Sequence, residues 1–368
     1  MKKTAALILT LVITVAASLT GCGYKYKELN LRAKFDQSLK GTTLTVYNWG
    51  EYISDGEDGS MDVNKEFEKL TGIKVKYLNY VSNETMYSQL KSGGVSYDII
   101  IPSDYMIERL KNENMLQKID ISKISNYDLI DEKYKGLFFD ENEEYSVPYN
   151  VGMVGIIYNE ELTGGDIEHS WKVLWDEKYK DMALNFDNSR DAFMTAQMIL
   201  GQDLNTENKA DWDAAADLLK KGKKNLQSYV MDEIFSKMET GEASVAPYYA
   251  GDYLTMLESN ESLKFFYPEE GTNIFVDSVC IPENAKNVDA ALMYINFLLE
   301  PDVATANAEY LGYASPNTAV VNNKDYCYYQ NKILYPDESD MPKVQYYHDI
   351  KSDIRTYYET LWSEVKLY

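Results

Sequence analysis

Histidine and cysteine are almost absent from this chain of 368 residues, which contains two histidines and three cysteines. Zinc sites are built from clusters of these residue types, so a zinc site is not expected, and neither another metal nor a cofactor is predicted. Three cysteines are also too few for the disulfide frameworks that hold small secreted domains together. Cys280 lies in the apolar run Val279-Cys280-Ile281 and is predicted to be a buried thiol.

Positive charge is in the minority, with 36 Lys and Arg against 59 Asp and Glu and a formal net charge of −23. Such a surface repels nucleic acid and attracts cations. The charge balance therefore argues against a polynucleotide partner and is compatible with a cationic ligand.

Long apolar runs are absent beyond the first residues, so no later stretch is expected to span a bilayer. Lys2-Lys3 and the apolar residues 5–17 predict an export signal over residues 1–21. Leu19-Thr20-Gly21-Cys22 resembles the bacterial lipobox, which implies that Cys22 is lipidated and anchors the chain to a membrane. Residues 22–40 are charged and lack a periodic apolar pattern, so we predict a tether there.

The body of the chain alternates strand and helix patterns. A strand at residues 44–49, a helix at 61–70 and a strand at 73–77 predict a βαβ unit with parallel strands. Two short strands at 145–149 and 154–158, with no helix between them, predict a crossing between two domains. The second region repeats the pattern with a strand at 182–186, helices opening after 187–190 and at 210–221 and 230–240, and a strand at 243–247. A strand at 274–282 crosses back, and helices follow at 290–299, 304–311 and 349–368.

Polar and aromatic residues gather where the predicted strands end, which is where α/β sheets bind ligands. The groups are Trp49, Glu51 and Tyr52; Ser103 and Tyr105; Asp187, Asn188 and Asp191; and Tyr249 and Asp252, with Phe275 and Asp277 on the returning strand. Together they predict a cleft between two domains, lined by aromatic rings and carboxylates. Rings and carboxylates suit an organic cation.

Seven short motifs follow one another along the chain: Y-N-W-G-E-Y at 47–52, S-N-E-T-M at 82–86, Y-D-I-I-I-P-S at 97–103, S-V-P-Y at 146–149, S-W-K-V-L-W at 170–175, D-S at 277–278 and L-G-Y-A-S-P-N at 311–317. In these motifs and their order, the chain resembles the bacterial polyamine-binding proteins of ABC importers, the spermidine/putrescine-binding family, from about residue 43 to its end. The resemblance implies an α/β, two-domain, periplasmic-binding-protein-like (type II) fold with a hinged ligand cleft. One lobe is expected from residues 41–148 plus 277–318, and the other from 149–276 plus 319–368.

The resemblance also implies a set of ligand-binding residues: Trp49, Glu51, Tyr52, Ser103, Tyr105, Asn188, Asp191, Tyr249, Asp252, Phe275, Asp277 and Tyr313. The aromatic residues are expected to enclose the methylene chain and the acids to bind the ammonium groups. Asn188 departs from the Asp common in binders of long polyamines, and Tyr249 and Phe275 stand where Trp is frequent. Glu51 and Tyr105 resemble the spermidine pattern and Asp252 and Phe275 the putrescine pattern, so both ligands remain open.

The expected function is capture of spermidine or putrescine by hinge closure and delivery to an ABC permease, by a monomeric, lipid-anchored protein that is not an enzyme. Three alternatives remain open. Tyr248-Tyr249 is a tyrosine pair of the kind that binds ferric ion, paired carboxylates could serve an exported hydrolase, and the protein could present a polyamine to a sensor instead of a permease.

Overall fold

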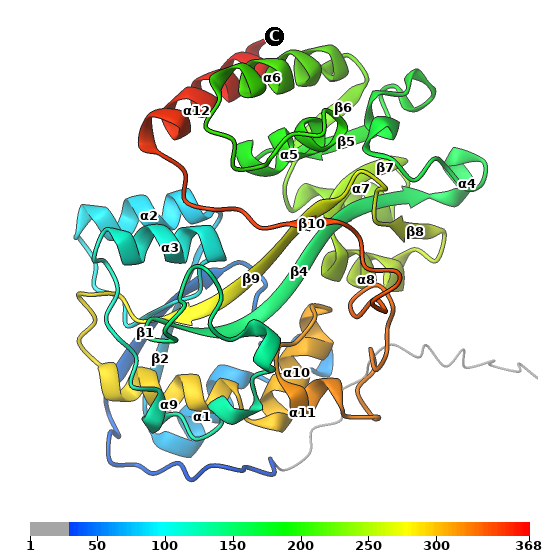
Figure 1. Ribbon diagram of the computed structural model, residues 1–368. Coiled ribbons are helices and arrows are strands. Elements are labelled where there is room, and N and C mark those ends of the chain that lie inside the picture. Colours follow the sequence, from blue (N-terminus) through cyan, green and yellow to red (C-terminus); the bar gives the residue numbers. More distant parts are fainter. Residues whose placement is uncertain (1–28) are drawn as a thin grey trace, which may run out of the picture.

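The computed structural model describes residues 29–368, in which one mixed sheet runs through the whole molecule (Figure 1). Its hydrogen-bonded order is β2-β1-β3-β9-β4-β7-β5-β6, while β10 pairs with β9 and β8 with β4. The strands are β1 (Thr43–Trp49), β2 (Lys74–Tyr80), β3 (Ile99–Ile100), β4 (Ser146–Asn159), β5 (Ala183–Phe186), β6 (Leu226–Val230), β7 (Val245–Tyr249), β8 (Leu263–Phe266), β9 (Thr272–Cys280) and β10 (Val344–Gln345). The expected α/β class is confirmed.

The first half of the molecule, in the lower part of Figure 1, consists of β1–β3 and the helices around them. β1 pairs in parallel with both β2 and β3, as the βαβ pattern predicted. Helix α1 ends at Gly72, whose φ of 72° is the left-handed conformation that glycine tolerates. The helices of this half are α1 (Val63–Thr71), α2 (Asn83–Ser92), α3 (Asp104–Asn112), α9 (Val288–Leu298), α10 (Pro301–Leu311) and α11 (Thr318–Val321).

The second half contains β5–β8 and ends in the C-terminal helix, which packs against α6 at the top of Figure 1. Its helices are α4 (Glu160–Thr163), α5 (Ser189–Ile199), α6 (Lys209–Lys223), α7 (Glu233–Glu239), α8 (Ala250–Ser259) and α12 (Ser352–Leu367). Strand β5 pairs in parallel with β6 and β7. This half therefore repeats the strand-and-helix arrangement of the first half.

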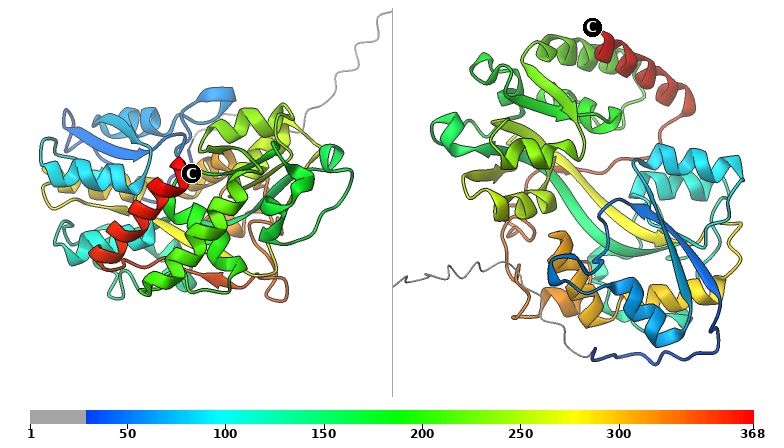
Figure 2. Two further views of the ribbon diagram at one scale, coloured as in Figure 1. Left: turned by 90° about the horizontal axis from the view of Figure 1, so that it is seen from above. Right: turned by 180° about the vertical axis from the view of Figure 1, so that it is seen from behind.

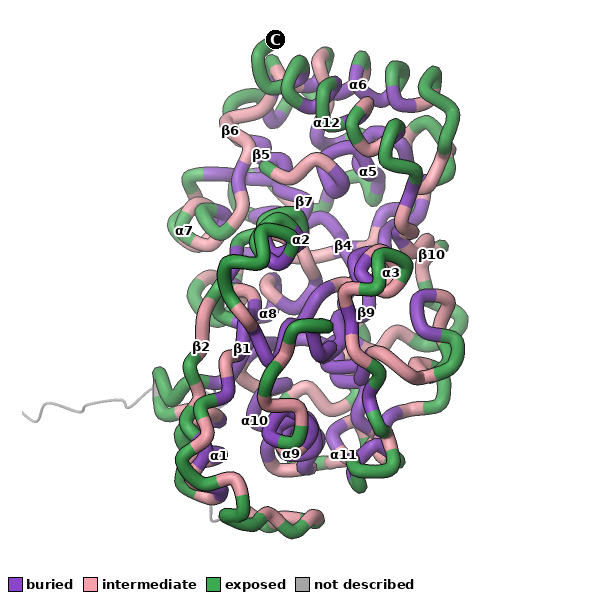
Figure 3. Tube along the Cα trace, turned by 90° about the vertical axis from the view of Figure 1, so that its left-hand side faces the viewer, coloured by how far each residue is buried: buried purple, intermediate pink, exposed green. Residues whose placement is uncertain are grey.

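Strands β4 and β9 connect the two halves and lie side by side in all views (Figures 1 and 2). They pair antiparallel, every residue of both strands is buried, and Figure 3 shows the pair deep inside the molecule. We predicted two short strands where β4 is a single strand of 14 residues. The sequence predicted a gap between the two strands at 150–153, because Asn150 and Gly152 interrupt the apolar pattern there. In the structure, pairing with β9 continues through this stretch, with a register shift between Pro148 and Asn150.

Some helices and turns differ from the expectation. The helix expected at 230–240 begins later, because the chain first forms β6. Three 3₁₀ turns lie at Ile121–Lys123, Tyr127–Leu129 and Trp171–Trp175, the last of them within the S-W-K-V-L-W motif. Helix α8 was not predicted, although it follows directly from a strand end with candidate site residues.

The expected tether is also wrong for residues 29–40, which pack against the first half. Leu29, Leu31, Phe35 and Leu39 contact its core, and the Phe35 ring meets Phe297 edge-on at 5.7 Å between centroids. The buried Glu300 carboxylate accepts the backbone N–H groups of Arg32 and Ala33 at 2.6 and 2.7 Å. The predicted export signal and Cys22 lie outside the described residues.

The described part of the chain has no helix with the length and apolar character needed to cross a bilayer. Cys280 is a buried free thiol, as predicted.

Candidate functional site

The end of β1 supplies the first wall of the site. Trp49 is half-buried, its indole N–H donates to the Ile101 carbonyl at 2.9 Å, and its ring leans on Tyr80 with 4.8 Å between centroids. Glu51 is exposed and has a left-handed backbone with φ of 47°. This turn reverses the chain after β1 and sends the next residue, Tyr52, inward, where it is 7% exposed.

Tyr52 meets the carboxylate of Asp277 from the crossing strand β9. The Tyr52 hydroxyl donates to Asp277 Oδ2 at 2.6 Å, whereas Oδ1 is buried without a hydrogen-bond donor. Burial raises the pKa of Asp277 to about 6, and the hydrogen bond from Tyr52 opposes this rise. A buried carboxylate oxygen without a donor is costly, so this atom is suited to an incoming cation.

Tyr313 makes a similar pair with Asp252 in the first turn of α8. The Tyr313 hydroxyl donates to Asp252 Oδ2 at 3.1 Å. Burial raises the pKa of Asp252 to about 8, and the negative charges of Asp232 and Glu51 add to the rise. Glu51 therefore lies near enough to Asp252 for their charges to interact.

Asp191 lies in the first turn of α5 and accepts hydrogen bonds from three side chains. Tyr249 and Asn188 donate to Oδ2, each at 2.6 Å, and Tyr347 donates to Oδ1 at 3.0 Å. Asn188 also caps the helix, since its Oδ1 accepts the backbone N–H of Asp191. This acid is thus held in place by residues from β7, α5 and the segment before α12.

Aromatic rings connect these carboxylates into one cluster. Tyr52 and Tyr313 meet edge-on at 5.5 Å between centroids, Tyr313 and Phe275 lie at 6.4 Å, and Phe275 and Tyr249 meet edge-on at 5.6 Å. The Phe275 ring lies directly over Gly152 of the neighbouring strand, where an added Cβ would come 2.2 Å from Phe275 Cζ. A glycine at this position is therefore required for the ring to lie flat on the crossing strands.

Ser103 and Tyr105 complete the cluster from the start of α3. Asn83 Nδ2 donates to Ser103 Oγ at 3.1 Å and to the Tyr105 hydroxyl at 3.2 Å, and the Tyr105 hydroxyl donates to Glu84 at 2.9 Å. The Tyr105 ring meets Tyr347 edge-on at 6.0 Å. These contacts run from Asp277 through Tyr52, Phe275 and Asp191 to Tyr105, and they join the side chains into one continuous cluster, which we call the enclosure.

The structure brings the predicted residues together, with differences among them. Ten of the twelve take part in the contacts just described, whereas Trp49 bonds to the Ile101 carbonyl and Glu51 is exposed. That these residues bind a ligand stays a prediction. Asn83 and Tyr347 were not predicted. Asn83 belongs to the S-N-E-T-M motif, which could have indicated it. Tyr347 belongs to one of several tyrosine pairs, and because such pairs are common in this chain, the pattern does not distinguish it.

The tyrosine pair considered for ferric ion has other roles. Tyr248 is 2% exposed and stacks on Phe186, and the Tyr249 hydroxyl is committed to Asp191. Across residues 29–368, no group of three or more His, Cys, Asp and Glu side chains converges as metal ligands.

The chain resembles proteins of known kind over most of its length. Residues 96–339 match the family model described as bacterial extracellular solute-binding protein. The spermidine/putrescine-binding periplasmic protein of Salmonella typhimurium is 36% identical, with 88% of this chain and 91% of that protein covered. The putrescine-binding periplasmic protein PotF of Escherichia coli is 29% identical, with 80% and 83% covered.

A solved structure described as a putative spermidine/putrescine ABC transporter from Listeria monocytogenes superposes with a TM-score of 0.83 at 38% identity, covering 89% of this chain and 100% of that one. The expected periplasmic-binding-protein fold is thereby confirmed, as is the resemblance drawn from the seven motifs. The chain belongs to the family of bacterial extracellular solute-binding proteins, among relatives named for spermidine and putrescine.

Proposed function

We propose that this chain is the extracytoplasmic binding component of a polyamine ABC importer, which captures spermidine or putrescine in the enclosure around Asp191, Asp252 and Asp277. The names of its relatives support this class of ligand and a transporter partner. Those relatives are binding proteins, so the chain is not assigned a catalytic activity.

The observation that carries the proposal is the Asp277 carboxylate, which is 4% exposed and has one oxygen without a donor. Removing a carboxylate from water costs free energy unless a cation or hydrogen bonds replace the water. Among the described residues no Lys or Arg forms an ion pair with Asp191, Asp252 or Asp277. An ammonium group supplied by a ligand would meet this need, and the adjoining rings would cover the methylenes.

The two halves contribute complementary parts. Tyr52, Ser103 and Tyr105 come from the first half, and Asp191, Tyr249 and Asp252 from the second. A ligand that contacts both sets stabilises the closed arrangement over an open one, because half of its contacts are lost on opening. We propose that the hinge lies at the β4–β9 crossing, near the register shift at Pro148–Asn150, and that the lobes divide near the boundaries expected from the sequence, with all of α11 in the first lobe.

We further propose that the protein is a monomer held at the cell membrane through lipidated Cys22. The lipobox-like sequence Leu19-Thr20-Gly21-Cys22 supports this anchor. Mass spectrometry of the membrane fraction of a producing strain tests it, and Cys22→Ser should release the protein from that fraction.

Isothermal titration calorimetry with putrescine and spermidine tests the ligand. We expect saturable binding of at least one of them, and loss of binding in the double variant Asp252→Ala/Asp277→Ala. The matched control is Asp325→Ala, because Asp325 is an exposed acid that is not among the proposed ligand-binding residues. An absence of heat and of thermal stabilisation with both polyamines would refute the proposal.

The alternatives find less support. The relatives are named for polyamines and not for iron or sugar hydrolysis, and the Tyr249 hydroxyl is already bonded to Asp191. Presentation of the bound polyamine to a sensor uses the same site, and the presence of permease and ATPase genes beside this one would favour transport.

A further inference from the structure

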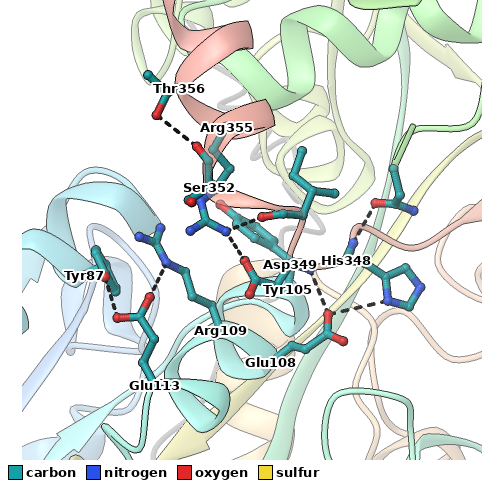
Figure 4. Close-up of polar contacts among 12 residues, drawn as sticks. Tyr87, Tyr105, Glu108, Arg109, Glu113, His348, Asp349, Ser352, Arg355 and Thr356 are labelled. Atoms are coloured by element: carbon teal, nitrogen blue, oxygen red, sulfur yellow. Dashed lines mark hydrogen bonds and ion pairs between the residues drawn. The ribbon is translucent and has the colours of Figure 1, made fainter. Parts of the chain in front are cut away.

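A cavity of about 600 Å³ lies beside the enclosure, on the other side of Tyr105. It is open to solvent on one side and is lined by both halves: Glu84, Tyr105 and Arg109 from α2 and α3, Arg190 from α5, and residues 348–363 from the segment that leads into α12. Five of these lining residues, Tyr105, Arg109, Asp349, Ser352 and Arg355, are labelled in Figure 4, which shows their polar contacts. Of the residues assigned to polyamine binding, the cavity shares only Tyr105. Its volume suits a small metabolite.

Among the positively charged residues that line this cavity, Arg190 is the one that forms no ion pair with a carboxylate. Arg109 forms an ion pair with Glu113 at 3.2 Å, Arg355 with Asp349 at 2.5 Å, and His348 lies 3.5 Å from Glu108. Within residues 29–368, no carboxylate oxygen lies within 4.0 Å of the Arg190 side chain.

Arg190 is nevertheless 5% exposed. Its Nη2 donates to Asn205 at 3.1 Å, its Nε is buried without an acceptor, and the rings of Tyr347, Tyr105 and Tyr358 surround the guanidinium at 4.3, 5.7 and 5.9 Å. The rings stabilise the charge but cannot replace a planar, bidentate acceptor. A carboxylate on a small molecule in the cavity would supply one.

The same cavity contains two acids that are bonded only to hydroxyl groups. Glu84 accepts from Tyr105 at 2.9 Å and Glu359 accepts from Ser189 at 2.5 Å. Partial burial of the Glu359 carboxylate and the nearby charge of Glu84 raise the pKa of Glu359, while the positive charge of Arg190 opposes this rise. A simple anion at Arg190 would meet repulsion from these acids, whereas a molecule with an ammonium group next to its carboxylate would satisfy both.

We propose that this cavity is a second ligand site, which takes a zwitterion of the α-amino-acid class with its carboxylate at Arg190 and its ammonium at Glu84 and Glu359. Because α2 and α3 of the first half and α5 and α12 of the second half line the cavity, an occupant holds the halves together. Occupancy therefore slows release of a polyamine from the enclosure, a coupling that rests on the proposed function.

Titration of ¹⁵N-labelled protein with L-glutamine, in saturating putrescine so that the enclosure is filled, tests the site. We expect saturable shifts of amides near Arg190 and Thr360, weaker or absent shifts with acetate or methylamine alone, and slower putrescine dissociation in stopped flow. Arg190→Gln should weaken glutamine binding about tenfold or more, since it removes a bidentate charged contact. Arg32→Gln, at an exposed arginine elsewhere, should not.

Thr360→Trp provides a variant that does not disturb the core, because Thr360 is exposed at the rim of the cavity. It should abolish glutamine binding and leave putrescine affinity unchanged. No saturable shift with glutamine, or equal binding to wild type and Thr360→Trp, would overturn the proposal. Failure of putrescine to bind would instead refute the polyamine function, and the glutamine titration on ligand-free protein would still test the second site.

Discussion

The carboxylates of the enclosure differ in how far the protein itself satisfies them. Asp191 receives three side-chain hydrogen bonds, whereas one oxygen of Asp277 receives none. Asp191 is thus fixed before a ligand arrives, and Asp277 retains capacity for a new donor. Substitution of Asp277 is therefore expected to lower the affinity for the ligand more than substitution of Asp191.

Asp277→Asn should weaken polyamine binding by roughly 100-fold or more, because an ammonium buried opposite a neutral amide loses about 3–5 kcal/mol. Calorimetry with putrescine measures the change. Asp325→Asn, the same substitution at an exposed position, is the control and should leave the affinity unchanged. Equal affinities of Asp277→Asn and wild type would contradict the role given to this residue.

The pH dependence follows from the two acids whose pKa values lie above their ordinary value near 4, Asp277 at about 6 and Asp252 at about 8. Because both pKa values are higher in the folded protein than in the unfolded chain, protonation of these acids stabilises the ligand-free folded state. This contribution to the free energy of unfolding is complete below about pH 4 and is lost as pH rises through about 6 and 8. Polyamine binding needs the ionised carboxylates, while the ligand amines stay charged like lysine.

The increase in Tm caused by putrescine should therefore grow between pH 5 and pH 8. Thermal denaturation at several pH values measures it, and Asp252→Asn should remove the rise near pH 8. An increase in Tm that is the same at every pH would show that neither acid is neutral in the ligand-free protein.

Residue types at strand ends were sufficient to predict most of the site. Parallel strands bring their carboxyl ends to one edge, so Tyr52, Ser103 and Asp191 follow from sequence order alone. Tyr347 could not be predicted in this way, because it lies on the irregular segment before α12 and reaches Asp191 only through the return of the chain.

At the scale of elements, the β4–β9 pair determines the shape of the site. Gly152 of β4 is paired with Phe275 of β9, and the absence of a side chain lets the ring cover the strand. The position of one wall of the enclosure thus depends on a residue that does not itself present a functional group.

Gly152→Ala should displace Phe275 and cost about 1–3 kcal/mol of the free energy of unfolding, as overpacking in a core usually does, with weaker polyamine binding. Urea denaturation and calorimetry measure the two effects. Gly94→Ala is the control, since a Cβ there would have only one neighbour within 4 Å, at 3.9 Å. Unchanged stability and affinity in Gly152→Ala would mean that the ring moves without cost.

A buried acid, Glu300, helps to hold the segment formed by residues 29–40, together with its apolar contacts to the core. Glu300→Gln should free it, because the carboxylate accepts two backbone N–H groups and the Asn126 amide at 2.7 Å. We expect faster hydrogen exchange of residues 29–40 and a loss of about 1–3 kcal/mol in the free energy of unfolding.

Asp128→Asn serves for comparison with Glu300→Gln. It removes the exposed ion pair with Arg32 and should cost less than about 1 kcal/mol. Equal effects of the two substitutions would mean that the buried acid has no special part in holding the segment.

Elements with a clear apolar period and a glycine stop, such as α1 and α10, could be predicted from sequence. Both end at glycines with φ of 72°. Strand β6 and residues 29–40 could not be predicted from sequence. Their apolar residues are few, and these residues pack against surfaces formed by distant parts of the chain.

At the scale of the molecule, polyamine binding should make the protein more compact. Small-angle X-ray scattering should give a smaller radius of gyration with putrescine than without it, since closure brings the two halves together around the ligand. The Asp252→Ala/Asp277→Ala variant should show no change. A radius that is the same with and without bound putrescine would exclude hinge closure as the response to ligand.

The position of β9 between β3 and β4 has a consequence for the order in which the chain folds. Strand β9, which joins β3 of the first half to β4, is not made until residues 272–280 emerge, long after β1–β3 at the other end of the chain. Contacts so distant in sequence delay folding, because the chain between them must be ordered first. We therefore expect a growing chain to complete its sheet only when most of the chain exists, and a chain without its complete sheet suits the export that the predicted signal implies.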